Sequence, residues 1–382
     1  MTQAVRRFFD YYRAPRVLGL DVLRIVASLT IVAYHGSTQA SFYNRGLLRH
    51  GYLAVDIFFV LSGFLLTRQA LKLRTNTRLM SFATRFWTRR WFRIIPAYWV
   101  MLGLITLGVA YLPIRANMSL ADLPRHLLFL QTLFPPNRYT VTWSLVTEEW
   151  FYLALPFMLA LFFLVPRRNV RVAGVLLILL IPSVVRAIMV QHGETPVLPQ
   201  ARFDGLVVGA GLGVIWSLVP QWKGRLHDSR KWLLAVGVLG AVFMFVATTR
   251  LNDGLVYWTA GLLAFNLFIG MTIPAMTVLQ WPRFLPIGLA AFVTFLSDLT
   301  YPLYLVHDIG YTIVDATGIH SKALYFAVAL PFIFLCAVVL HFAVERPFLA
   351  WRARIDSSTK RTVASPGQVH SGLQAAGAEA AA

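Results

Sequence analysis

The sequence predicts an all-α, polytopic integral membrane protein that crosses the bilayer about ten times, with both termini in the cytoplasm. Three observations predict this fold class. Of the 382 residues, 58% are hydrophobic, which is more than a soluble globular domain carries. The apolar residues come in runs of about twenty, the length at which a helix spans ~30 Å of hydrocarbon. Loops that are rich and poor in basic residues also alternate along the chain.

Windows of about twenty apolar residues predict the ten membrane helices. These windows lie near residues 20–38, 51–70, 94–112, 143–165, 172–190, 203–219, 232–249, 254–279, 298–316 and 323–343. Arginine and lysine gather before the first window and after each even-numbered one, whereas the alternate loops hold fewer of them. Because strongly basic loops stay in the cytoplasm, this alternation predicts cytoplasmic termini.

The charge balance indicates the partners of the chain. It carries 35 Lys and Arg against 16 Asp and Glu, a formal net charge of +19. The basic residues flank apolar runs, so we expect a lipid bilayer as the partner and no nucleic acid. Cys336 is the only cysteine, and the sequence has no Cys/His spacing typical of a metal site, so no metal is expected.

The predicted organisation is a single transmembrane domain over residues 1–346, followed by a cytoplasmic tail over residues 347–382. From about Asp356 onward the tail is small, polar and alanine-rich, so it has little to bury. We therefore expect it to be mostly disordered. No soluble domain is expected at either end.

The first predicted helix carries two ionisable residues, Arg24 and His35. Eleven residues are about three helical turns, so both side chains should share one face, roughly 16 Å apart along the axis. Ionisable groups inside a membrane are costly and usually face a protein interior or a wet cavity. We therefore expect a cavity beside this helix. The alternative is that Arg24 reaches the headgroups and His35 bonds a backbone carbonyl.

Polar residues also mark the second and third helices. Ser62 is one of the small residues that let a neighbouring helix approach closely, and Asp56 is expected either to bond another helix or to contact a substrate. Arg90 and Arg93 lie three residues apart in a segment that alternates arginine with aromatics. They are expected either to hold phosphates, which suit the planar guanidinium, or to anchor the helix at the headgroups.

Two adjacent carboxylates, Glu148 and Glu149, open the fourth helix. Neighbouring residues of a helix point in different directions, so the two are expected to have different roles. Glu148 lies three and four residues before Phe151 and Tyr152, which predicts that it occupies the more buried face. Glu149 is predicted to face the aqueous edge.

Two later segments carry further polar residues. Arg202 and Asp204 precede the glycine-rich sixth helix, where a local ion pair is expected. His307 lies on an apolar face of the ninth helix. Such a position is more typical of a hydrogen-bonded core histidine than of a catalyst.

Together these segments resemble the acyltransferase 3 family of bacterial inner-membrane O-acyltransferases, from about Leu20 to Pro347. The resemblance is carried by Arg24 and His35 with ten residues between them, the segment Gly51–Phe64, the Arg90/Arg93 pair, the string WSLxxExxFY from Trp143 to Tyr152, Arg202 with Asp204, and the string TYxLYLxH ending at His307. It implies a multi-pass enzyme of the bacterial inner membrane that transfers an acyl group, commonly acetyl from acetyl-CoA, to a hydroxyl. Polysaccharides, lipopolysaccharide O-antigen and glycolipids are the acceptors we expect, with no permanently bound cofactor.

The resemblance also suggests roles for individual residues. His35 is expected to act as base or acyl carrier, Arg24 to hold the donor, and Glu148 to orient the site or assist as a base. Arg90 and Arg93 are expected to bind the CoA phosphates. A set with substrate-binding or structural roles is also expected, made up of Asp56, Ser62, Trp143, Tyr152, Arg202, Asp204, Tyr301 and His307.

Two other functions compete with this one. Acylation of a small secondary metabolite such as a macrolide needs the same chemistry. A transporter without acyl chemistry predicts inverted repeats and paired broken helices, which the sequence does not show. We expect no extracytoplasmic hydrolase-like domain of the kind that some members of the resembled family carry, so the chain is expected either to complete the transfer alone or to pass the acyl group to a separate extracytoplasmic transferase.

Overall fold

The computed structural model describes residues 17–39, 47–74, 78–108, 118–134, 137, 139–194, 196, 198–247, 254–279 and 286–364. Throughout these residues the protein is helical and contains no strand. The longer helices are α2 (Leu18–Gln39), α3 (Ala54–Leu73), α4 (Leu79–Gly108), α6 (Trp143–Leu164), α7 (Arg168–Gln191), α8 (Asp204–Leu218), α9 (Pro220–Asp228), α10 (Arg230–Ala247), α11 (Leu262–Met276), α12 (Ile287–Asp315), α13 (Lys322–Leu340) and α14 (Arg346–Ala364). Short helical segments are η1 (Leu47–Leu53), η2 (Leu120–Asp122), α5 (Leu123–Leu127), η3 (Thr140–Thr142), η4 (Pro199–Ala201), and the π-helical turns η5 (Tyr257–Gly261) and η6 (His341–Glu345).

In the described residues the structure confirms an all-α protein with several helices long and apolar enough to cross a membrane. Eight helices in the described residues are long and apolar enough to cross a membrane, or nine if α8 and α9, bent by 110° at their junction, form one span. Each of the ten predicted windows overlaps a helix. However, α8 has only 15 residues, about 22 Å of helix, which is less than the thickness of the hydrocarbon core.

Two helices begin well before their predicted windows. Helix α4 starts at Leu79 rather than near residue 94, and it continues through Pro96. The arginine- and tryptophan-rich segment predicted to precede the third span is therefore part of that helix. Helix α12 likewise starts at Ile287 rather than near residue 298.

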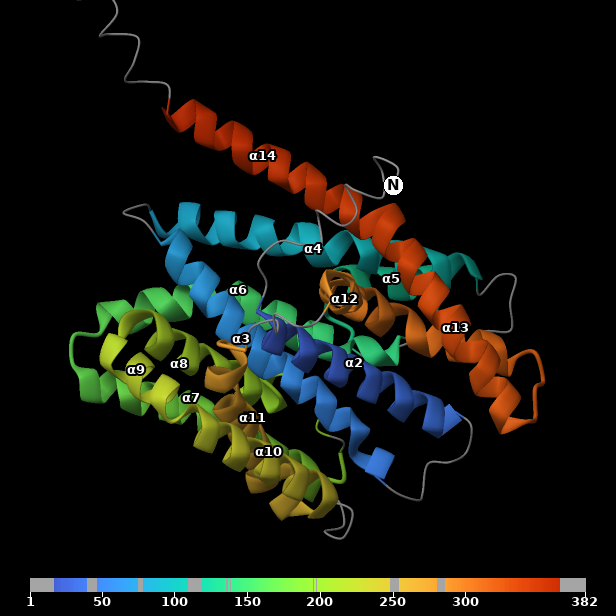
Figure 1. The fold of residues 1–382 in the computed structure, drawn as a ribbon, viewed down its shortest axis with the longest axis horizontal. Coiled ribbons are helices and arrows are strands. Elements are labelled where there is room, and N and C mark those ends of the chain that lie inside the picture. The colour runs from blue at the N-terminus through green and yellow to red at the C-terminus, as the bar shows by residue number, and fades with distance from the viewer. Residues whose placement is uncertain are drawn as a thin grey trace, which may run out of the picture.

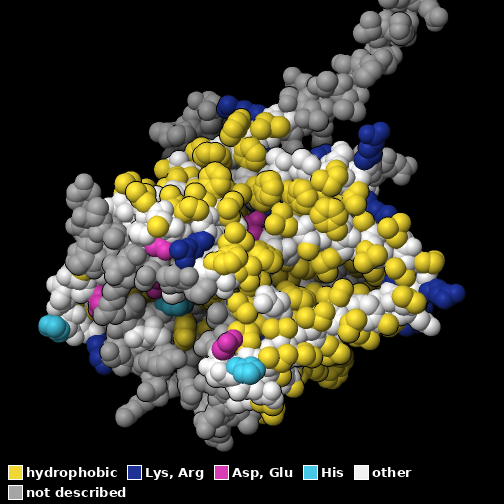
Figure 2. Space-filling view, turned by 180° about the vertical axis from the view of Figure 1, so that it is seen from behind, with side chains coloured by type: hydrophobic (Ala, Val, Ile, Leu, Met, Phe, Trp, Pro, Cys, Tyr) yellow, Lys and Arg dark blue, Asp and Glu magenta, His cyan; other side chains and the backbone are white. Residues whose placement is uncertain are grey.

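Helix α3 lies at the centre of the bundle, between α2 on one side and α8 and α11 on the other (Figure 1). Its apolar window is 72% buried, whereas that of α7 is only 17% buried. The outer helices expose large apolar side chains such as Leu177, Leu239 and Leu335. Figure 2 shows one face of the molecule as a broad hydrophobic expanse, with most of the visible Lys and Arg around its edges. A surface of this kind is suited to contact with acyl chains.

Helices α3 and α8 pack closely because glycines face each other's backbone. A Cβ on Gly63 would lie 2.1 Å from the Leu206 carbonyl oxygen, and one on Gly209 would lie 2.0 Å from the Val60 carbonyl oxygen. Small residues allow such approach in membrane bundles, where van der Waals contact drives helix association. The central helix is therefore fixed tightly against one neighbour.

The chain continues through η6 into α14, within the segment assigned to a tail from the sequence. Helix α14 packs on α4, where Arg352 donates to the Arg89 carbonyl oxygen at 3.2 Å and the rings of Trp351 and Phe92 lie 5.1 Å apart. The first part of the predicted tail is thus a helix in the structure. Residues 365–382, the rest of that tail, lie outside the described residues.

Candidate active site

A cavity of about 340 Å³ opens between α2, α3, α4, α6 and α12. Six of the residues singled out from the sequence line it: Arg24, Ser62, Arg90, Arg93, Glu148 and Tyr301. The remaining polar lining residues are Gln69, Ser144, Thr300 and Tyr304, and the apolar ones include Phe58, Leu61 and Leu65. These residues come from five helices, so the fold brings together motifs that are far apart in the sequence.

Arg24 reaches this cavity from α2 and is held by its own helix. Its Nη1 lies 3.1 Å from Oδ1 of Asp21, one turn earlier, and the same oxygen accepts a hydrogen bond from Ser297 of α12 at 2.7 Å. Because the carboxylate is buried and bonded from two helices, it fixes the direction of the guanidinium. The expectation that Arg24 faces a cavity is confirmed.

Glu148 is the centre of a hydrogen-bonded network in the cavity wall. One carboxylate oxygen accepts from Ser62 of α3 at 3.0 Å, and the other accepts from the Tyr152 hydroxyl one turn along α6. Arg90 of α4 lies 3.5 Å from the second oxygen and donates to the Tyr152 hydroxyl at 2.6 Å. Its guanidinium carbon also lies 4.5 Å from the centre of the Tyr152 ring. This network joins three helices and leaves much of Arg90 committed to the protein.

Arg93 lies one turn after Arg90 on the same cavity wall. In the part of the chain that the structure describes, no carboxylate pairs with it and no hydrogen bond holds its guanidinium. It is half-buried, so its charge is only partly hydrated. Of the two arginines, Arg93 is therefore the one with more of its hydrogen-bonding capacity available to an anionic ligand.

His35 does not line the cavity but contacts His307, with 4.9 Å between the ring centres. His307 is fully buried on α12, and its ring lies 5.7 Å from the ring of Tyr304, which does line the cavity. The Tyr304 hydroxyl contacts the Ser144 hydroxyl at 2.5 Å. The predicted pair on the first helix is therefore divided, because Arg24 faces the cavity directly and His35 lies behind Tyr304 and His307.

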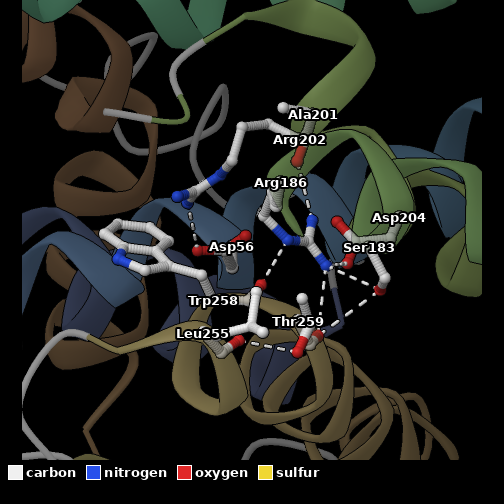
Figure 3. Close-up of polar contacts among 9 residues, drawn as sticks. All are labelled: Asp56, Ser183, Arg186, Ala201, Arg202, Asp204, Leu255, Trp258 and Thr259. Atoms are coloured by element: carbon white, nitrogen blue, oxygen red, sulfur yellow. Dashed lines mark hydrogen bonds and ion pairs between the residues drawn. The ribbon is translucent and has the colours of Figure 1, made fainter. Parts of the chain in front are cut away.

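A second group of charges is packed entirely between helices, away from the cavity lining (Figure 3). Arg202 pairs with Asp56 of α3 at 2.7 Å, and Arg186 of α7 pairs with Asp204 of α8 at 2.8 Å. All four side chains are at most 2% exposed. The predicted local pair between Arg202 and Asp204 is therefore wrong. Asp56 bonds Arg202, which lies just before α8, and so has the first of its two predicted roles, a bond to another part of the bundle rather than a substrate contact.

Arg186 was not singled out from the sequence. It bonds the carbonyl oxygens of Ala201, Trp258 and Thr259 and the hydroxyl of Ser183 (Figure 3). Two of these carbonyls belong to the π-helical turn η5, where the hydrogen-bond pattern of the helix changes. The buried Arg186 guanidinium donates to both of them. A lone arginine in the middle of an apolar stretch was the available signal, because such residues need a partner inside the bundle.

The remaining predicted residues have structural contacts. The Trp143 ring lies 4.8 Å from the Arg202 guanidinium and 6.0 Å from the Phe59 ring, so it closes one side of the buried charges. The Tyr301 hydroxyl donates to the Ile94 carbonyl oxygen at 2.8 Å while the residue lines the cavity.

Glu149 does not face an aqueous edge, as the sequence suggested. It is 2% exposed and accepts a hydrogen bond from the Trp91 indole at 3.2 Å. The prediction failed because an aqueous edge was placed beside the helix start, whereas the long helix α4 covers that position.

Among the described residues, no group of three or more His, Cys, Asp or Glu side chains is arranged to hold a metal ion. The polar side chains that line the cavity are three arginines, one glutamate, the amide of Gln69 and several hydroxyls. Such a set can bind an anionic ligand and orient a hydroxyl or carbonyl beside it.

Comparison with known proteins identifies a family and several relatives. Residues 17–342 match the model of a family described as an acyltransferase domain. A candidate O-acetyltransferase of Staphylococcus aureus strain COL is 27% identical over 64% of this chain and 42% of its own length. A candidate peptidoglycan O-acetyltransferase of Bacillus subtilis, YrhL, is 28% identical over 56% of this chain and 36% of its length.

A third relative, the peptidoglycan O-acetyltransferase OatA of Listeria monocytogenes, is 30% identical over 40% of this chain and 25% of its length. The chain thus matches less than half the length of each of these curated relatives. No solved structure matches the chain.

Proposed function

Because the chain belongs to the acyltransferase domain family, whose model matches residues 17–342, we propose that it transfers an acetyl group from acetyl-CoA to a hydroxyl of a cell-surface carbohydrate. The names of three relatives support the acetyl group, and two of those names support peptidoglycan as one carbohydrate of this class. The single observation that carries the proposal is the arginine-lined cavity, because the donor is both anionic and elongated.

The cavity suits acetyl-CoA in charge and in shape. Arg93 has unused donors for phosphate oxygens, and Arg24 supplies a second guanidinium from the opposite helix α2. In the same cavity, Phe58, Leu61 and Leu65 provide an apolar wall for the uncharged arm that carries the thioester. In this arrangement Arg90 serves mainly to hold Glu148 and Tyr152 in place and contributes its remaining donors to the ligand.

The reaction moves one proton and one acetyl group. His35 accepts the proton of the acceptor hydroxyl as the oxygen bonds to the thioester carbonyl carbon, and it then gives that proton to the departing CoA thiolate. The products are the acetyl ester and free CoA. Transfer through an acetylated His35 gives the same balance in two steps. Glu148 orients the acceptor or the Ser62 hydroxyl at the cavity wall.

The proposal includes a topology of ten spans with both termini in the cytoplasm of a bacterium and the protein in its inner membrane. The alternation of basic loops supports this orientation. Helices α8 and α10 supply the two spans beyond the eight that length and composition identify. With this orientation Arg93 lies toward the cytoplasmic supply of acetyl-CoA and His35 toward the far leaflet, so the protein also carries the acetyl group across the membrane. Any separate extracytoplasmic transferase would receive it there.

Transfer of label to carbohydrate tests the function. Purified protein in lipid nanodiscs, given acetyl-CoA labelled in its acetyl group, should label peptidoglycan fragments or exported polysaccharide, and His35→Ala should abolish that label. Free CoA released without ester formation, or wild-type turnover by a folded His35→Ala protein, would contradict the proposal.

The two arginines of α4 provide a sharper test of the donor site. Arg93→Ala should raise the KM for acetyl-CoA by about 10- to 100-fold, the effect of losing one charge-assisted hydrogen bond. Arg90→Ala should raise the KM and also lower kcat, because Glu148 loses its cation. Arg225→Ala on the exposed helix α9 is the matched control and should leave both constants unchanged. If Arg93→Ala does not change the KM for acetyl-CoA, the arginines of α4 serve only to anchor the helix at the lipid headgroups.

A further inference from the structure

The tautomer of His307 is fixed by its own helix. Its Nδ1 lies 2.7 Å from the Tyr304 carbonyl oxygen and 3.1 Å from the Leu303 carbonyl oxygen. A carbonyl oxygen can only accept, so Nδ1 must carry the hydrogen. In the neutral imidazole Nε2 therefore holds a lone pair, and His307 can act only as an acceptor at that nitrogen.

That Nε2 is buried and has no hydrogen-bond partner among the described residues. His307 itself is 0% exposed, so bulk water does not satisfy the nitrogen. Buried polar atoms in folded proteins are nearly always bonded, and an exception calls for a role. His126 also has a buried Nε2 without a partner in the described structure, so the neighbours of the His307 nitrogen decide whether it has a role.

His35 is the neighbour that this lone pair can serve. The Nδ1 edge of the His307 ring points back to its own helical turn, so Nε2 lies on the edge away from that turn. Two aromatic rings contact the His307 ring, those of Tyr304 and His35. Tyr304 belongs to the helical turn whose carbonyl oxygens already accept the hydrogen bond from Nδ1 of His307. The His35 ring, from α2, lies 4.9 Å away in an edge-on arrangement of 62°.

Helices α2 and α12 are clamped on both sides of this histidine pair. The Tyr311 hydroxyl donates to the Val32 carbonyl oxygen at 3.0 Å, and Ser28 donates to the Thr300 carbonyl oxygen at 3.5 Å. Gly36, next to His35, lies so close to Tyr311 that an added Cβ would be 2.5 Å from its hydroxyl oxygen. The two rings are thus held in register by backbone contacts that do not depend on the imidazoles.

We propose that His307 is a positioning residue that accepts an N–H from His35 and thereby keeps the lone pair of His35 on its other nitrogen, directed at the acceptor hydroxyl. This inference rests on the proposed function and adds a residue to its mechanism. When His35 takes the hydroxyl proton, the resulting imidazolium has two N–H groups. One stays bonded to Nε2 of His307, and the other carries the proton that leaves with the CoA thiolate.

The arrangement performs the task of the acid residue in a serine-protease triad with a neutral acceptor. There, a buried group bonded to the histidine fixes the tautomer, and its replacement by an amide lowers kcat by about 10⁴-fold although the geometry is kept. A neutral partner stabilises the imidazolium less than a carboxylate does. We therefore expect the loss of the His307 acceptor to cost about 100-fold in kcat, the upper end of what outer-shell partners contribute.

Two substitutions of His307 test the roles of its two ring nitrogens separately. In His307→Asn the amide nitrogen replaces Nδ1 and can still donate to the Tyr304 carbonyl, but the acceptor at Nε2 is lost. In His307→Gln the longer amide places an oxygen near the former Nε2. We expect His307→Asn to lower kcat about 100-fold with KM for acetyl-CoA unchanged within about twofold, and His307→Gln to recover at least tenfold of that loss. His320→Asn, at an exposed histidine after α12, is the control and should behave as the wild type.

A direct measurement keeps the test decisive if a variant does not fold. In wild-type protein labelled with ¹⁵N at histidine, NMR should show His307 with a protonated Nδ1 and an unprotonated Nε2, assigned by the signals lost in His307→Gln. Equal loss of kcat in the Asn and Gln variants, a changed KM with unchanged kcat, or a protonated Nε2 in neutral His307 would each overturn the proposal. If the wild-type protein acetylates no carbohydrate, the proposed function fails, whereas the NMR result still decides whether His307 is arranged as an acceptor.

Discussion

The buried pair between Asp56 and Arg202 offers a quantitative test of how the bundle is held together. The two charges are 2.7 Å apart and at most 2% exposed. At an effective dielectric constant of about 20 their gross attraction is about 6 kcal/mol, most of which offsets the cost of removing both from water. Removing one partner leaves the other charge buried, which typically costs about 3–5 kcal/mol of the free energy of unfolding.

The two single variants should not cost the same amount. In Asp56→Ala, Arg202 can turn toward Asp204, whose Oδ1 has no partner in the described structure, so we expect a cost near 3 kcal/mol. In Arg202→Met, the cation nearest to Asp56 in the cluster is Arg186, which is already bonded to Asp204 and several carbonyls. We therefore expect a cost near 5 kcal/mol.

The double variant Asp56→Ala/Arg202→Met leaves no unpaired charge and should recover most of that loss, since apolar replacements of buried pairs are often nearly neutral. The assay is reversible unfolding in mixed micelles, followed by tryptophan fluorescence, with Arg225→Ala as the exposed control. If Arg202→Met costs less than about 1 kcal/mol, the pair is open to water and our view of a dry, structural charge cluster is wrong.

Two further predictions concern packing and the cavity wall. Gly209→Ala should destabilise the protein by about 1–3 kcal/mol, because the new Cβ would lie 2.0 Å from the Val60 carbonyl oxygen. Gly103→Ala, where a Cβ meets nothing within 4 Å, should instead stabilise α4 by up to about 1 kcal/mol. Thermal unfolding in detergent measures both, and equal shifts in one direction would contradict the close approach of α3 and α8. Glu148→Gln should lower kcat about 10- to 100-fold and leave the fold intact, since the amide still accepts from Ser62 but no longer neutralises Arg90. Wild-type kcat in this variant would remove Glu148 from the mechanism.

The sequence was informative where a partner lies on the same helix or where a residue is too polar for its surroundings. Glu148 and Tyr152 are four apart, so their contact follows from helical periodicity. Each apolar window located a helix, but α14 was predicted as part of the tail, and α4 and α12 begin at Leu79 and Ile287 rather than near residues 94 and 298. The start of α4 is rich in arginine and tryptophan, which lowers the mean hydropathy of a window without breaking the helix. The start of α12 is apolar, so hydropathy does not explain the late start of its predicted window.

The choice of partners between helices could not be predicted. Arg202 and Asp204 are two apart, a spacing at which side chains point in different directions, so their proximity in sequence was misleading. Their actual partners come from α3 and α7, at sequence separations of 146 and 18 residues. For the same reason, nothing in the local sequence indicated that His35 and His307 would be in contact.

Burial and position relative to the cavity separate the framework residues of this protein from those proposed to take part in its chemistry. Asp56, Arg202 and Arg186 are dry and bonded between helices, as charges must be when their task is to hold a bundle together. Arg93 is half-buried on a cavity wall with donors to spare, which serves a ligand that comes and goes. His307 combines the two conditions, because it is as dry as the framework residues yet keeps one acceptor unused beside His35. Because Asp56 Oδ1 and Arg202 Nε are also buried without a partner among the described residues, burial alone does not mark His307, and it is the His35 ring beside its lone pair that indicates a bond used in the reaction.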